Sequence, residues 1–131
     1  NIPMLVSKEL NLDIDLFKNG EIATLFKLNC EWLNKLIKVK DIKSLENVIK
    51  IVPVSIKAEL EKLLSKAKEV DYGNIIIAPL YYGALRYYDG IYYRVINDNL
   101  TLCNGGVYSS EGISSLGFAL YTDNLLKILE D

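Results

Sequence analysis

The first 70 residues carry apolar side chains at helical spacing. Six of them recur three or four residues apart after Asn19-Gly20, beside Trp32: Ile22, Leu25, Phe26, Leu33, Leu36 and Ile37. This spacing predicts one helix over about 22–37. A second, short helix is predicted from about Ser44 to Lys50, ended by Pro53. A third is predicted after Ser55 as N-cap, with an apolar stripe made of Ile56, Leu60, Leu63, Leu64, Ala67 and Val70.

Residues 71–131 have a strand-like pattern and contain all 9 tyrosines of the chain. A short strand is predicted over Ile75–Ala78, before Pro79. The next strand has a period of two. One of its faces carries Leu85, Tyr87, Ile91, Tyr93 and Val95, and the other carries Arg86, Tyr88, Gly90, Tyr92 and Arg94.

Turn-forming residues at 97–99 predict that this strand doubles back into a second strand over 100–103. Another strand is predicted over Gly117–Leu120. It leads into a terminal helix that begins at Thr122 or Asp123 and buries Leu125, Leu126 and Leu129. The predicted fold class is α+β, an antiparallel sheet with helices packed on one side. We expect a single partial domain over 1–131, with a helical layer at 1–70 and a strand-rich part with a C-terminal helix at 71–131.

Composition and charge narrow the classes of function. The net charge is −2, and the lysines concentrate before residue 70, where they alternate with glutamates on predicted helices. This pattern is typical of solvated helix faces, so no nucleic-acid partner is expected. No apolar run approaches the roughly 20 residues that span a bilayer, so no membrane segment is expected. Residues 1–20 lack the features of a secretory signal, and the two separate cysteines fit a reducing cytoplasm.

The chain contains no histidine. Ser-His-Asp and Cys-His nucleophilic sites are therefore excluded within it. Cys30 and Cys103 stand in unrelated contexts without a CxxC spacing, so a zinc site built from Cys and His is also excluded. We expect no metal and no cofactor.

Three segments in the second half carry a family resemblance: Leu85 to Gly90, Gly105 to Tyr108 with a predicted Gly-Gly turn, and Ser115 to Leu126. In order and spacing they resemble the histidine-binding and third signature regions of the histidyl-tRNA synthetase-like family. The motifs cover about residues 72–130. The resemblance implies a class II aminoacyl-tRNA synthetase-like fold, of which this chain corresponds to the C-terminal half of the catalytic-like domain.

The resemblance implies a histidine pocket lined by Tyr88, Gly90, Gly105, Gly106 and Tyr108. A tyrosine offers such a ligand an aromatic wall and a hydroxyl, while glycine lets the backbone come close to it. For Tyr81, Tyr82 and Tyr92 we favour an ordinary half-buried position in a strand, because aromatic residues suit pleated surfaces. For Tyr88 the site and the ordinary strand position stay open.

Three positions depart from the synthetase pattern. Gly83 replaces the arginine that assists amino-acid activation, and Val107 replaces the arginine of the family's Gly-Gly-Arg-Tyr-Asp segment. Asn124 aligns with the arginine that the synthetases present to the ATP phosphates. A guanidinium there stabilises charge as pyrophosphate departs, and asparagine has none. These changes imply a protein that is not an enzyme.

Within the family, the chain looks most like the regulatory subunit of ATP phosphoribosyltransferase. The resemblance implies a role in histidine biosynthesis, namely activation of a catalytic ATP phosphoribosyltransferase subunit and histidine sensing, and an oligomer at full length. One alternative is a fragment of a divergent histidyl-tRNA synthetase. Another is a stand-alone interaction module with a tyrosine-rich surface.

Overall fold

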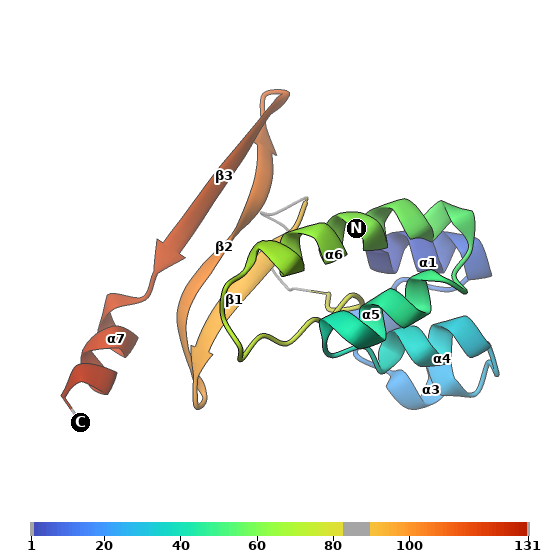
Figure 1. Ribbon diagram of the computed structural model, residues 1–131, viewed down its shortest axis with the longest axis horizontal. Helices are drawn as coiled ribbons and strands as arrows, with labels where there is room; N and C mark the ends of the chain where they lie inside the picture. The colour runs from blue at the N-terminus through green and yellow to red at the C-terminus, as the bar shows by residue number, and fades with distance from the viewer. Residues whose placement is uncertain (1, 83–89, 131) are drawn as a thin grey trace. The chain divides into compact units, whose positions relative to one another are not determined.

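The computed structural model describes residues 2–82 and 90–130 (Figure 1). The chain forms two compact units, Asn1–Ala84 and Leu85–Asp131. The first contains helices, and the second contains a three-stranded antiparallel sheet followed by a helix. The predicted α+β class is therefore confirmed. The packing of helices on one side of the sheet and the synthetase-like fold stay predictions, as does the single partial domain.

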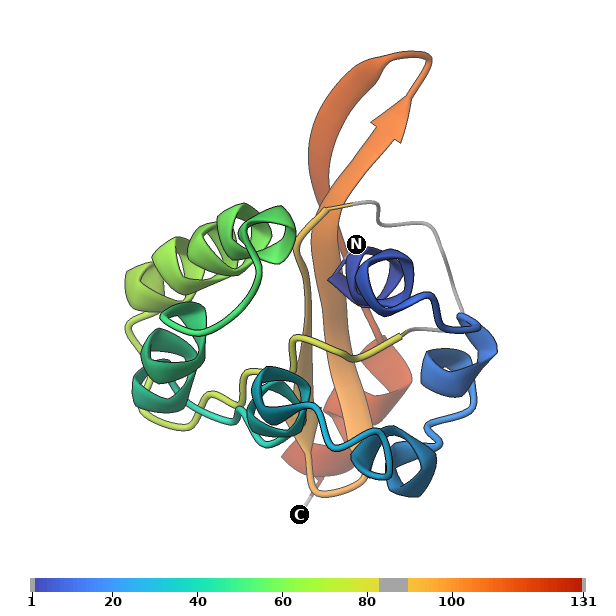
Figure 2. The same ribbon diagram turned by 90° about the vertical axis from the view of Figure 1, so that its right-hand side faces the viewer.

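The first unit is built from six helices in the described residues, several of which are seen end-on in Figure 2. Their bounds are α1 Ile2–Leu10, α2 Asp15–Lys18, α3 Ile22–Phe26, α4 Glu31–Ile37, α5 Ile42–Ile49 and α6 Val54–Glu69. The longest helix, α6, packs against α1 and α5. Seven side chains are almost completely buried in this core: Val6, Leu33, Leu36, Leu45, Val48, Ile56 and Leu60. Burial of these apolar side chains, rather than helix propensity, stabilises such short helices.

The prediction of a single helix over 22–37 is wrong, because the helix is interrupted by a short loop between α3 and α4. Asn29 has φ 52°, a left-handed conformation that asparagine tolerates, and Cys30 is extended. Leu25, Leu33 and Leu36 are nevertheless all buried, whereas Ile22 is exposed. Two helices joined by a short loop can thus present apolar residues to one core with nearly the spacing of one helix.

The predicted starts of the next two helices are also corrected. Asp41 is the N-cap of α5, and Ser44 lies in its first turn rather than at its start. Pro53 precedes α6, so Ser55 lies inside that helix, where its hydroxyl donates a hydrogen bond to Oε2 of Glu9 at 2.7 Å. Ser55 therefore connects α6 to α1.

Asp41 and Ser44 form a capping box. The backbone N–H of Ser44 donates to Oδ1 of Asp41 at 2.8 Å, and the backbone N–H of Asp41 donates to the Ser44 hydroxyl at 3.2 Å. The hydrogen bond from the Ser44 side chain, and then that from its backbone, lower the pKa of Asp41 below its ordinary value of 3.8. The pKa of Asp41 is lower in the folded state than in the unfolded state. The charged cap therefore stabilises the fold at pH values above the unfolded-state pKa. This contribution is lost as the pH falls through the folded-state pKa.

We therefore expect the variant Asp41→Asn to flatten part of the acid dependence of stability. Asparagine keeps the cap but does not titrate. Wild type should be the more stable at neutral pH, and its advantage should vanish in acid. Urea unfolding followed by helical circular dichroism at a series of pH values measures the difference. Parallel stability curves for the two proteins would contradict the expectation.

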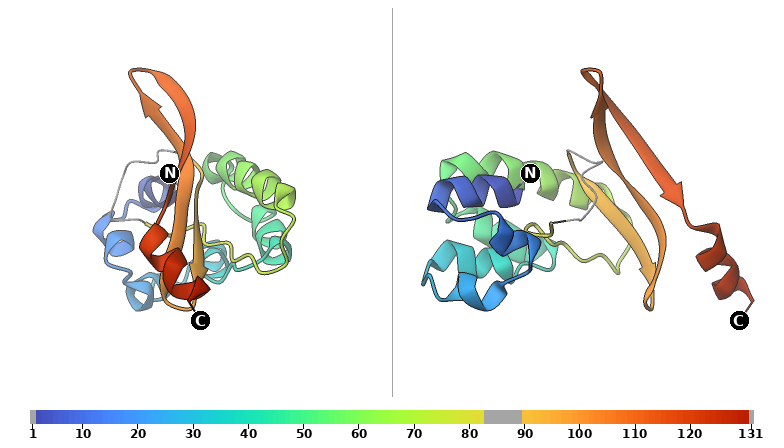
Figure 3. Two further views of the ribbon diagram at one scale, coloured as in Figure 1. Left: turned by 90° about the vertical axis from the view of Figure 1, so that its left-hand side faces the viewer. Right: turned by 180° about the vertical axis from the view of Figure 1, so that it is seen from behind.

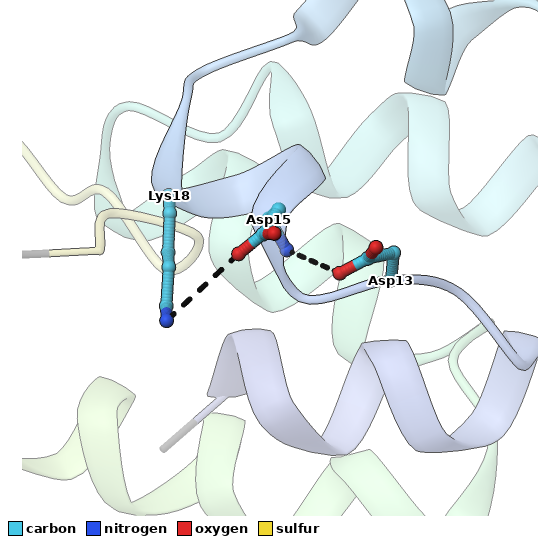
Figure 4. A network of polar contacts seen from close by, with 3 residues as sticks. All are labelled: Asp13, Asp15 and Lys18. Atoms are coloured by element: carbon cyan, nitrogen blue, oxygen red, sulfur yellow. Dashed lines mark hydrogen bonds and ion pairs between the residues drawn. The ribbon is translucent and has the colours of Figure 1, made fainter.

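Charged side chains on the helices of the first unit lie at the surface. Asp13 accepts a hydrogen bond from the backbone N–H of Asp15 at the start of α2, and Asp15 pairs with Lys18 at 3.9 Å (Figure 4). Exposed pairs also join Lys35 to Glu31 and Lys62 to Glu59. Pairs of this kind contribute little to stability, in agreement with the predicted solvated helix faces.

The strand predicted over Ile75–Ala78 is wrong, since these residues form no strand in the part of the chain that the structure describes. Ile77 is buried among the helices, and its backbone N–H donates to the carbonyl oxygen of Lys40 at 2.9 Å. Tyr81 and Tyr82 likewise lie outside any described strand. A short apolar run can thus serve a helical core as well as a sheet.

In the second unit, the strands β1 Tyr92–Asn97, β2 Leu100–Ser110 and β3 Ile113–Leu120 form one sheet in the order β1-β2-β3. The predicted hairpin at 97–99 is confirmed, with Asp98 at φ 53°. Glu111 and Gly112, both with positive φ, turn β2 into β3. Figure 3 shows that β2 and β3 form a long twisted ribbon, so both strands exceed their predicted lengths.

The terminal helix α7, Thr122–Leu129, begins where predicted. Its predicted buried face is wrong. Leu126 and Leu129 are exposed, while Leu125 and Ile128 are half-buried. The helix contacts β2, and Figure 3 shows it extending away from the end of β3, so only part of its apolar surface meets the sheet.

The sheet has two chemically different faces. Strand register places five large apolar side chains on one face, all of them exposed: Tyr93, Val95, Leu116, Phe118 and Leu120. The opposite face carries Tyr92, Arg94, Asn104, Tyr108 and Gly117. The predicted alternation is confirmed over Tyr92–Val95. None of the described helices is long and apolar enough to cross a membrane.

Candidate functional site

The paired glycines of the candidate site lie inside a strand. Gly105 and Gly106 are in the middle of β2, and neither has positive φ, so the predicted Gly-Gly turn is wrong. Gly105 pairs with Tyr93 and Phe118, whereas Gly106 pairs with Tyr92 and Gly117. The backbone stays extended through both glycines because β2 is paired with β1 on one side and with β3 on the other.

Neighbouring side chains leave little room for a Cβ at three of the glycines. The ring of Tyr93 occupies the place where a Cβ of Gly105 would lie. A Cβ at Gly90 would stand 2.7 Å from the Cβ of Val107, and one at Gly117 would stand 2.9 Å from Cε1 of Tyr108. These glycines therefore make room for neighbouring side chains.

The register separates some of the predicted pocket residues. Gly106 and Tyr108 lie on the face that also carries Tyr92. Gly105 and Val107 lie on the opposite face, where Gly90 is next to the Val107 side chain. Tyr88 and Gly83 fall outside the described residues. Of the five predicted pocket residues, the described structure thus brings Gly106 and Tyr108 to one face.

The face that carries Gly106 and Tyr108 also contains four hydrogen-bonded side chains, which we call the polar strip: Arg94, Tyr92, Asn104 and Tyr121. Nε and Nη2 of Arg94 donate to the Tyr92 hydroxyl at 3.3 and 3.2 Å. The Tyr92 hydroxyl donates to Oδ1 of Asn104 at 3.4 Å. Nδ2 of Asn104 donates to the Tyr121 hydroxyl at 2.7 Å. The strip thereby joins β1, β2 and the junction between β3 and α7.

Reasoning from sequence missed this strip. Strand periodicity places Tyr92 and Arg94 on one face, but the preference of aromatic residues for strands favours an ordinary strand position for Tyr92. Asn104 lies outside the three segments that carry the resemblance, and Tyr121 has no assigned role within them. The two residues are 17 positions apart in the sequence, so their contact forms only in the folded sheet. The pairing of β2 with β3 that brings them together is not encoded in any local pattern.

Asn124, the residue at the synthetase arginine position, has a structural contact. Its Nδ2 donates to the backbone carbonyl oxygen of Thr101 at 2.8 Å, and its side chain is half-buried. The backbone N–H of Tyr121 similarly donates to the carbonyl oxygen of Leu102. Asn124 therefore attaches the first turn of α7 to β2.

The described residues contain no group of three His, Cys, Asp or Glu side chains that could hold a metal ion. Cys30 and Cys103 belong to different units, and both are half-buried thiols. The polar strip presents hydroxyl, amide and guanidinium groups on one face of the sheet of an α+β protein.

Comparison with known proteins finds two relatives that share one name. The chain is similar to the ATP phosphoribosyltransferase regulatory subunit of Wolinella succinogenes, with 36% identity over 126 residues that cover 96% of this chain and 44% of that protein. It is also similar to the protein of the same name from Helicobacter hepaticus, with 34% identity over 128 residues that cover 98% of this chain and 45% of that protein.

The chain thus spans somewhat less than half the length of the curated relatives that it matches. No protein-family model matches the sequence, and no solved structure matches it. The predicted resemblance to the ATP phosphoribosyltransferase regulatory subunit is confirmed by these two relatives. The wider resemblance to histidyl-tRNA synthetases stays a prediction.

Proposed function

We propose that this chain acts in a regulatory subunit of ATP phosphoribosyltransferase, in histidine biosynthesis. It would activate a catalytic phosphoribosyltransferase subunit in the cytoplasm and help that enzyme sense histidine. One observation carries the proposal: the similarity extends over 96% of the chain to a protein of that name. Because the chain matches only part of its relatives, the partner and the oligomer belong to the complete protein.

A role without catalysis is supported by the residues at the synthetase positions. Gly83, Val107 and Asn124 provide none of the three cationic side chains of the synthetase pattern. The Asn124 amide, moreover, donates to the Thr101 carbonyl oxygen rather than being presented to a ligand. A site without these cations would stabilise departing pyrophosphate poorly.

The proposed histidine site keeps the five residues Tyr88, Gly90, Gly105, Gly106 and Tyr108. The common face of Gly106 and Tyr108 supports a direct contact from these two. Gly90 and Gly105 would act through the side chains that they accommodate, Val107 and Tyr93. A bound ligand regulates the assembly only if it binds one of its states more tightly than the other.

The test uses the complete natural protein with and without the catalytic phosphoribosyltransferase subunit. We expect the two to co-purify, histidine to bind weakly to the isolated protein or only in the complex, and ATP not to bind the isolated protein. Calorimetric titration measures both ligands. Tight ATP binding, or ATP–pyrophosphate exchange, would support a divergent synthetase instead. Failure to co-purify with the phosphoribosyltransferase would favour a stand-alone interaction module.

A further inference from the structure

The pair Asn-Gly occurs twice in the chain, at Asn19-Gly20 and at Asn104-Gly105. In such a pair the backbone nitrogen of the glycine, once it has lost its proton to hydroxide, can attack Cγ of the asparagine. A C–N bond forms, which closes a succinimide ring, and the Cγ–Nδ2 bond breaks as ammonia leaves with a proton from water. Water then opens the ring at either carbonyl and gives aspartate or isoaspartate. Glycine favours the attack because it has no side chain to block the approach.

The sheet holds the second pair away from this geometry. Gly105 is buried in β2, which is paired with β1 on one side and with β3 on the other. Nδ2 of Asn104 donates to the Tyr121 hydroxyl at 2.7 Å, so its side-chain amide is also engaged. Rotation of the Asn104 backbone toward ring closure would separate β2 from its partner strands.

The first pair lies in an exposed turn of the helical unit. Asn19 is the C-cap of α2, with φ −91° and ψ 0°, and Gly20 follows with φ 63°. Both residues are exposed, and a Cβ at Gly20 would meet nothing within 4 Å. The Gly20 N–H donates to the Phe17 carbonyl oxygen at 3.2 Å, at the long end of the range for such bonds. Solvent and the Asn19 side chain can therefore both reach this nitrogen.

Opening this turn is a small, local event. Rotation about the Cα–C bond of Asn19 releases the Gly20 N–H from Phe17 and the Glu21 N–H from the Leu16 carbonyl oxygen. The helix that these bonds end, α2, has only 4 residues, and a helix this short has little stability of its own. Local opening of exposed turns costs far less free energy than opening of a paired strand in a sheet.

We infer that Asn19 is a site of spontaneous deamidation and isoaspartate formation in the folded protein, whereas the sheet protects Asn104. This inference is independent of the proposed regulatory function. The aspartate product adds a negative charge at the carboxyl end of α2. The isoaspartate product adds a methylene to the main chain. That methylene moves the N–H groups of Gly20 and Glu21 out of line with their acceptors, so the isoaspartyl protein loses the turn between α2 and α3.

The experiment follows both pairs in the complete natural protein, incubated at mildly alkaline pH either folded or in guanidinium chloride. Peptide mass spectrometry with a separation that resolves asparagine, aspartate and isoaspartate measures each conversion. In the folded protein Asn19 should convert at least about 10-fold faster than Asn104, because the rate falls exponentially with the cost of opening. In denaturant the two rates should become similar, since glycine follows both asparagines. Equal rates in the folded protein, or a ratio that persists in denaturant, would overturn the inference.

Asn19→Gln is the matched variant. Glutamine keeps the amide at this exposed position, but its longer side chain closes the corresponding ring much less readily. Conversion at residue 19 should be lost, while Asn104 behaves as in wild type. Release of ammonia from residue 19 at the wild-type rate would contradict attack through the succinimide ring.

Amide hydrogen exchange at Glu21 tests the loss of the turn. After incubation, the isoaspartyl fraction of wild type should exchange this amide faster than unmodified protein does, because the bond to Leu16 is broken. Incubated Asn19→Gln should exchange it as slowly as before. Equally slow exchange in the isoaspartyl fraction would show that the turn survives the modification, against the proposal.

Discussion

Replacing Leu60 by alanine is expected to lower the free energy of unfolding of the helical unit by about 2–5 kcal/mol. Leu60 has no exposed surface and lies on α6, the helix that packs against both α1 and α5. Truncation removes buried apolar surface and leaves a cavity that three packed helices cannot close freely. The loss is a large fraction of the stability of a small domain.

Urea unfolding followed by helical circular dichroism measures this change. Leu28→Ala is the matched control, because Leu28 is 44% exposed in the loop between α3 and α4. Its midpoint should stay close to that of wild type, while that of Leu60→Ala falls clearly. Equal midpoints for the two variants would show that α6 does not contribute the core described above.

Replacing Gly90 by alanine should weaken the pairing of its segment with β2, by about 1–3 kcal/mol as for other overpacked positions. The new Cβ would lie 2.7 Å from the Cβ of Val107. Since a Cβ cannot rotate away from its own backbone, either the backbone at Gly90 or the backbone at Val107 must shift. Two hydrogen bonds are at stake, from the Gly90 N–H to the Val107 carbonyl oxygen and from the Val107 N–H to the Ile91 carbonyl oxygen.

Amide hydrogen exchange at Gly90 and Val107 reports this weakening directly. Gly73→Ala is the control, since a Cβ at Gly73 meets nothing within 4 Å. Gly105→Ala should cost less than Gly90→Ala, because the exposed Tyr93 ring can swing aside. The double variant Gly90→Ala with Val107→Gly should relieve the collision. Faster exchange in the double variant than in the single one would contradict this account.

Several features of the fold follow from local signals in the sequence. The turn at 97–99 is specified by residues that tolerate left-handed backbone, and Asp98 has that conformation. The alternation of Tyr92 to Val95 and the start of α7 at Thr122 follow equally from neighbouring residues. Each of these features depends on a few consecutive positions, so the sequence pattern is enough to predict it.

The candidate site could be predicted only in part. Motif resemblance selected Gly105, Gly106 and Tyr108, but Gly105 lies on the face opposite to the other two because both glycines are inside a strand and not in the predicted turn. The polar strip depends on strand register, because Asn104 meets Tyr121 only when β3 pairs with β2. No local pattern specifies which residues lie opposite each other on strands paired across a sheet.

Apolar periodicity determined that the first half is helical, that the second half is strand-rich, and that a helix follows the last strand. The absence of histidine was enough to exclude Ser-His-Asp and Cys-His nucleophilic sites within the chain. Tertiary structure alone decided that Ile77 joins a helical core, that Leu126 and Leu129 stay exposed, and that Asn124 binds the Thr101 carbonyl oxygen. The physical reason is that burial and partner choice depend on segments distant in the chain, whereas backbone conformation responds first to its nearest neighbours.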